Sequence, residues 1–171
     1  MIAAPPHVVR AVGALMAVVK TAMLAAFIAM LGLTLVQVAN RVAIGAPIFW
    51  TEELIVLLLV WSVLLGLPVQ LWSHEEILVD VWPARTARLA RVKLLVAAAL
   101  SIGFCAILLY AGWHYAGRGA PVSSPALGLS RFWFFLPIPL GAGLGILALL
   151  FRPPPTETEL QQGADRLGLD A

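Results

Sequence analysis

The stretch Phe49-Trp50-Thr51-Glu52-Glu53 places two adjacent carboxylates directly before an apolar run, residues 54–72, that contains no charged residue. A helix of roughly 20 residues, at about 1.5 Å each, crosses the hydrocarbon core of a bilayer. The acidic pair is therefore expected at the water boundary, where the exposed amides and the positive dipole end of the helix favour negative charge. Thr51 is predicted as the N-cap, and Trp50 as an interfacial aromatic anchor.

The overall composition agrees with a membrane protein. The 171 residues are 61% hydrophobic and only 12% charged, against roughly 25% charged in a typical soluble domain. The formal net charge is +2 and the basic residues form no stripe, which argues against nucleic acid as a partner. The single cysteine, Cys105, excludes an internal disulfide, a Cys-x-x-Cys redox pair and a cysteine-based metal site.

The apolar stretches predict an all-α integral membrane protein, with one transmembrane domain at residues 1–152. The four predicted spans are about 14–39, 53–72, 92–113 and 132–151. Lys20, near one end of the first span, is expected to snorkel to the headgroups. The polar segment 73–91 predicts a turn or a short interfacial helix between the second and third spans. The polar tail, 153–171, is predicted to be disordered.

The distribution of Lys and Arg predicts the orientation, because cytoplasmic loops are enriched in basic residues. With the N-terminus inside, the cytoplasmic side collects Arg10, Lys20, Arg85, Arg88, Arg91, Lys93, Arg152 and Arg166. The outer side then keeps Arg41, Arg118 and Arg131. Both termini are therefore predicted to be cytoplasmic, with the acidic pair on the outer face.

The chain shows no signature of an enzyme, a cofactor site or a metal site. Its three histidines, His7, His74 and His114, fall in the N-terminal segment and at opposite membrane faces, so bis-histidine ligation of haem is not expected. No Ser-His-Asp arrangement, phosphate loop or zinc motif occurs. Glu52 and Glu53 could serve as a proton or cation site. Their boundary position favours a helix cap or a contact with a partner instead.

The centres of the spans carry no ionisable residue, whereas a carrier needs polar groups or broken helices near the midplane. No transport pathway is therefore predicted inside this chain. Gly66 and the Gly-x-x-x-Gly pair Gly141 and Gly145 permit close helix packing. The small residues Gly141, Gly145, Ala97 and Ser101 and the aromatic residues Trp61 and Trp133 present more small and aromatic surface than a four-helix bundle needs, which favours contact with another membrane protein.

The order of several motifs resembles the small, DctQ-like membrane subunit of tripartite ATP-independent periplasmic (TRAP) transporters. The similarity covers roughly residues 12–151. It is carried by Asn40-Arg41, Trp50-Thr51-Glu52-Glu53, Val60-Trp61, Leu65-Gly66, His74, Asp80 and Leu136-Pro137-Ile138-Pro139-Leu140-Gly141. The Trp-x-Glu-Glu element is the most specific of these.

The resemblance implies a multi-pass protein of the bacterial inner membrane that accompanies a large permease subunit. In that family the large subunit holds the substrate and sodium sites, and a periplasmic protein captures the solute. The small subunit is expected to enlarge the static scaffold and to help dock the binding protein for cation-coupled uptake of an organic acid. Its partners would be the permease subunit, the solute-binding protein and membrane lipid.

Two other classes stay open from the sequence. A small carrier could build its pathway between two copies of this chain, although no charged residue lies mid-span to support it. A membrane-bound redox or haem subunit is separable by the absorbance spectrum of the purified protein. The transported solute and the coupling ion are not readable from this chain, because the residues that choose them would lie in other chains.

Overall fold

The computed structural model describes residues 5–45, 48–73 and 87–151, and these ranges are almost entirely helical. The helices are α1 (Pro6–Ile44), α2 (Phe49–Ser73), α3 (Ala87–Gly119), α4 (Phe132–Phe135) and α5 (Pro137–Phe151). Four segments are long and apolar enough to cross a membrane: Pro6–Ala43, Phe49–Ser73, Val96–Gly119 and Phe132–Phe151. The predicted all-α fold with four membrane-spanning helices is therefore confirmed.

Helix α1 is longer than the predicted span, because it continues through the polar residues that bound this span, Arg10 at one end and Asn40 and Arg41 at the other. Pro6 stands at the first helical position, where its missing N–H leaves no gap in the hydrogen bonding. Gly45 ends the helix in the left-handed conformation, with φ 74°, and its N–H donates to the carbonyl of Arg41 at 3.2 Å. Glycine adopts this conformation without a Cβ penalty, so α1 ends sharply.

Helix α2 begins two residues earlier than the predicted N-cap. Thr51 lies inside the first turn, and its side chain donates to the carbonyl of Ile48 at 2.6 Å. Because the helix already begins at Phe49, Thr51 is not the residue that precedes it, and the N-cap prediction is wrong. Thr51 is 1% exposed, so this bond to Ile48 also satisfies a buried polar group.

The fourth span consists of two consecutive helices because of its prolines. Leu136 separates α4 from α5, and its N–H donates to the carbonyl of Phe132 at 2.9 Å. Pro137 and Pro139 cannot donate to the preceding turn. The ladder resumes where the N–H of Leu140 reaches the carbonyl of Leu136 at 3.3 Å.

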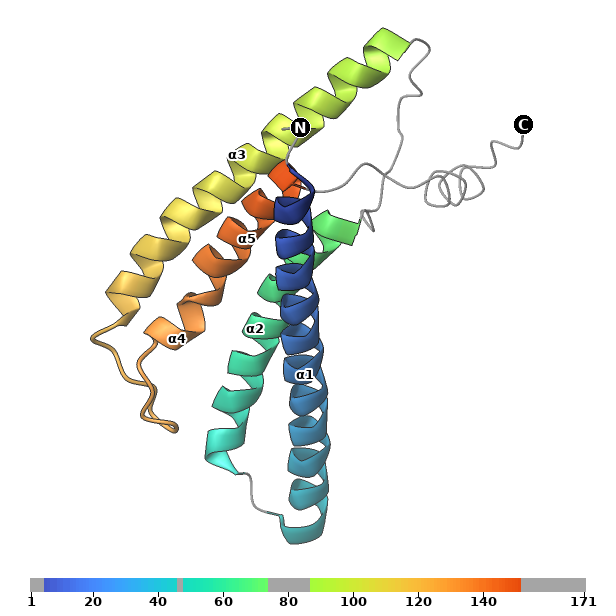
Figure 1. Cartoon of the computed structure of the whole chain (residues 1–171). Helices are drawn as coiled ribbons and strands as arrows, with labels where there is room; N and C mark the ends of the chain where they lie inside the picture. Colours follow the sequence, from blue (N-terminus) through green and yellow to red (C-terminus); the bar gives the residue numbers. More distant parts are fainter. Residues whose placement is uncertain (1–4, 46–47, 74–86, 152–171) are drawn as a thin grey trace.

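The spans form an open row rather than a closed bundle (Figure 1). Helix α1 packs on α2, α2 on α5, and α5 on α3, with α4 also lying against α3. Within the described ranges α3 makes no contact with α1 or α2. Many large apolar side chains are exposed as a result, among them Val18, Ile28, Leu35 and Ile107. In lipid such exposure carries no hydrophobic penalty, since lipid tails are as apolar as the side chains.

Glycines bring the central helices of the row together. Gly141 is buried, and a Cβ placed on it would meet the backbone carbonyl of Leu64. Gly145 faces Leu67, whose Cδ2 would lie 2.9 Å from an added Cβ. The close approach predicted for the Gly-x-x-x-Gly pair thus occurs inside the chain, between α5 and α2, rather than on an outer face.

Candidate functional site

The two carboxylates of the acidic pair have different surroundings. Successive residues of a helix are about 100° apart around its axis, so neighbouring side chains take different directions. The side chain of Glu53 is half-buried, whereas that of Glu52 is exposed. The two acids look equivalent in the sequence, whereas in the structure they differ in exposure and in hydrogen-bond partners.

Glu53 joins the start of α2 to the loop between α3 and α4, residues 120–131, which we call the α3–α4 loop. The hydroxyl of Ser124, 71 positions later in the chain, donates to the carboxylate. The backbone N–H groups of Ala126 and Leu127 donate to the same oxygen, Oε2, at 3.1 and 2.9 Å. Hydrogen bonds to a charged acceptor are the stronger class, so Glu53 is a firm anchor for this loop.

The α3–α4 loop also has hydrogen bonds of its own. The N–H of Ser124 donates to the carbonyl of Leu129 at 2.8 Å, and that of Arg131 donates to Val122 at 2.8 Å. Ser123 and Ser130 form an isolated antiparallel bridge between these bonds. Gly128 supplies the positive φ, 66°, that the turn requires. The segment is therefore a hairpin-like turn with a defined shape. It is shorter than the predicted loop, because α3 continues to Gly119.

Glu52 remains accessible beside the last turns of α1. Its Oε1 accepts a hydrogen bond from Nε2 of Gln37 at 3.4 Å, a long and therefore weak contact. Arg41 is exposed in the last turn of the same helix, and Trp50 is 46% exposed at the start of α2. An acid, an amide, a guanidinium and an indole are thus accessible at one end of the α1–α2 pair.

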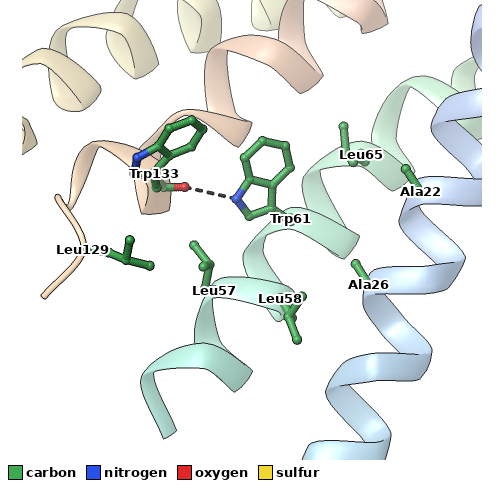
Figure 2. Close-up of a pocket in the computed structure, with 8 residues that line it drawn as sticks. All are labelled: Ala22, Ala26, Leu57, Leu58, Trp61, Leu65, Leu129 and Trp133. Atoms are coloured by element: carbon green, nitrogen blue, oxygen red, sulfur yellow. Dashed lines mark hydrogen bonds between the residues drawn. The ribbon is translucent and has the colours of Figure 1, made fainter. Parts of the chain in front are cut away.

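A second feature is an apolar cleft of about 430 Å³ over the middle of α2. Figure 2 shows its lining residues: Ala22, Ala26, Leu57, Leu58, Trp61, Leu65, Leu129 and Trp133. The indole Nε1 of Trp61 donates to the backbone carbonyl of Trp133 at 3.1 Å, which ties α2 to α4. The polar atom of this indole is therefore used within the chain, and the cleft presents hydrocarbon surface.

The remaining predicted positions serve helix packing. A Cβ on Gly66 would lie 3.3 Å from Sδ of Met23, so this glycine lets α1 approach α2. Pro137 and Pro139 are buried, and Pro139 packs where Gly112 of α3 leaves room. His74 and Asp80 lie outside the described residues.

The predicted residues do not converge on a single pocket. Arg41, Trp50, Glu52 and Glu53 cluster at one end, Trp61 borders the cleft, and the glycines and prolines lie between helices. Among the described residues, no group of three or more His, Cys, Asp or Glu side chains could hold a metal ion.

Sequence reasoning missed the partners of Glu53. Ser124 lies in a stretch rich in Gly, Pro and Ser that reads only as a loop, and the other two donors are backbone amides. Every residue except proline has a backbone N–H, so the residue types alone do not indicate which amide donates, and no sequence pattern could have predicted these bonds. The same holds for the carbonyl of Trp133.

These features define the class of protein as a multi-pass membrane protein whose motifs serve helix packing and one anchored loop. Residues 30–152 match the family described as tripartite ATP-independent periplasmic transporters, DctQ component. This match covers well over half of the chain, and the chain belongs to that family. It is a small component of a TRAP transporter, in agreement with the resemblance in its motifs. No curated protein matches the chain.

Proposed function

We propose that this chain is the scaffold subunit of a TRAP transporter of the bacterial inner membrane. It enlarges the static part of the large permease subunit and helps to dock the periplasmic solute-binding protein. The complex takes up an organic acid with a coupling cation, and the residues that bind both belong to the permease subunit.

The observation that carries this proposal is the open row of helices. Helix α1 contacts mainly α2, and its large apolar side chains are exposed along its length, including Val18, Ile28, Leu35 and Val42. Helix association in lipid depends on van der Waals packing and hydrogen bonds. Because α1 packs on α2 with one face, its other faces can pack in the same way against a second membrane protein. The charge-free span centres supply no pathway for a polar solute.

Glu52 is the accessible group that we assign to contact with the permease subunit. Glu53 is already bonded to the α3–α4 loop, whereas Glu52 is exposed and accepts a long bond from Gln37 among the described residues, so it can receive a cationic or amide group from a partner. A carboxylate that pairs with a partner in a partly dehydrated interface contributes more than an exposed pair. This assignment replaces the equivalent roles that the sequence suggests for the two acids.

We expect the unmodified chain to co-purify with the permease subunit in a one-to-one complex, and Glu52→Gln to reduce the yield of that complex severalfold. Arg118→Gln is the matched control, since it removes one exposed charge from the same end of the chain on α3, away from α1. The measurement is the subunit ratio after affinity purification in mild detergent. If Glu52→Gln preserves the complex but changes the sodium or pH dependence of uptake, Glu52 belongs to a coupling site.

We further infer that the α3–α4 loop faces the periplasm and that both termini are cytoplasmic. The support is the excess of Lys and Arg on the side of the termini. A reporter that is active only outside the cytoplasm should give a strong signal when fused after Arg118 and none when fused after Arg152. The opposite pattern would reverse the orientation and place the acidic pair inside the cell.

A further inference from the structure

The α3–α4 loop presents an ordered surface at the end of the row. It extends past the ends of α3 and α4 in Figure 1. Val122 and Leu129 are 43% and 39% exposed, and Pro121, Pro125 and Ala126 are exposed as well. Arg118 and Arg131 are exposed on either side, and no acidic residue lies between them in the sequence. The surface is therefore apolar at its centre, and the two arginines at its base outnumber the single Glu53 carboxylate that the loop binds.

This surface is held in place from outside the loop. Ser124 is 5% exposed because its side chain turns inward to the Glu53 carboxylate. The neighbouring amides of Ala126 and Leu127 are directed to the same carboxylate. The loop's internal bonds fix its shape, and within the described residues the hydrogen bonds that join its tip to α2 are those to Glu53. Glu53 thus sets where the exposed residues stand relative to the rest of the chain.

We propose that Glu53 is the positioning residue of a docking surface, the α3–α4 loop, for the solute-binding protein. Glu53 acts through the loop and does not itself touch the partner. This inference rests on the proposed function and on the inferred orientation. A surface that is ordered before contact loses little conformational freedom on binding, so its position contributes directly to affinity. The charge of the loop suits a partner whose docking face is acidic around an apolar centre.

The test uses the full chain in complex with the permease subunit in lipid nanodiscs, with the purified binding protein as the probe. Glu53→Gln keeps the size of the side chain, but it replaces one acceptor oxygen with an NH₂ group that opposes the loop donors. Ser124→Ala removes the hydroxyl donor, and Ser124→Thr retains it. Ser123→Ala is a matched neighbour that leaves the Glu53 bonds in place.

In Glu53→Gln and Ser124→Ala, we expect hydrogen exchange of the loop segment to be about tenfold faster and docking of the binding protein to be about tenfold weaker. Ser124→Thr should keep both quantities near those of the unmodified chain, and Ser123→Ala should leave loop exchange unchanged. If Glu53→Gln leaves hydrogen exchange of the loop unchanged, Glu53 does not position the loop. Faster exchange with unchanged docking would show that the binding protein does not use this surface.

Either of these two results overturns the inference while the scaffold function stands, because the complex with the permease subunit would still form. Failure of the unmodified chain to co-purify with the permease subunit would instead overturn the proposed function. The two failures are therefore measured separately.

Discussion

Gly141→Ala is expected to destabilise the chain by about 1–2 kcal/mol, although alanine is the better helix former. The substitution improves helix propensity by roughly 0.5–1 kcal/mol. The added Cβ, however, would meet the backbone carbonyl of Leu64, which cannot rotate away as a side chain can. Overpacking of this kind costs typically ~1–3 kcal/mol, so the steric term exceeds the propensity term. Thermal unfolding in detergent, followed by tryptophan fluorescence, measures the difference.

Two other glycines of α5 provide graded controls. At Gly145 the nearest atoms are Cδ2 of Leu67 at 2.9 Å and Cδ1 of Leu71 at 3.2 Å, and these side-chain ends can move. At Gly143 the nearest atom is Cδ1 of Leu109 at 3.8 Å, an ordinary contact. We therefore expect the loss of stability to fall from Gly141→Ala to Gly145→Ala, and Gly143→Ala to be neutral or stabilising. Equal effects at Gly141 and Gly143 would contradict the close approach of α5 to α2.

The packing of these glycines also changes how a loss of complex formation in glycine variants should be interpreted. The sequence suggests that bulky residues at Gly141 and Gly145 would loosen a complex with another subunit. Because both glycines pack against α2, such substitutions should destabilise this chain first. A loss of co-purification in these variants would therefore not locate the interface, whereas Glu52→Gln changes an accessible group.

The four spans could be predicted from the sequence because each depends on a local property, a long run without charge. The charge-free residues 54–72 determine the second span almost alone. The order of the helices in the row could not be predicted in the same way. Apolar side chains surround most of each helix, so no periodic pattern distinguishes the face that meets a neighbouring helix from the face that meets lipid.

The candidate site was predictable only in part, for a related reason. The sequence singled out Glu52 and Glu53 because the two carboxylates stand directly before a long run without charge. It could not separate their roles, since the difference depends on a loop more than 70 positions away. Trp61 was likewise singled out as an aromatic residue, but its acceptor is a backbone carbonyl on α4. Contacts that join side chains to distant backbone become visible only in the folded chain.

The anchored loop and the open row indicate different kinds of contact. The loop is small, ordered and polar at its base, as suits a partner that binds and leaves. The row offers long apolar helix faces within the membrane, as suits a partner that stays. Under the proposed function, the chain would hold the permease subunit permanently through its helices and contact the binding protein transiently through its loop.

The largest expected effect is an all-or-none dependence of uptake on the other subunits. The purified chain in liposomes should show no saturable solute uptake under a sodium gradient, because the span centres carry no Asp, Glu, Lys, Arg or His side chain to handle a polar solute or a cation. Uptake should appear when the permease subunit is reconstituted with the chain and the binding protein is added with its solute. Liposomes that hold the permease subunit and binding protein without this chain are the control, and they should transport much more slowly. Saturable uptake by this chain alone would overturn the scaffold function and identify a carrier that builds its pathway between two copies.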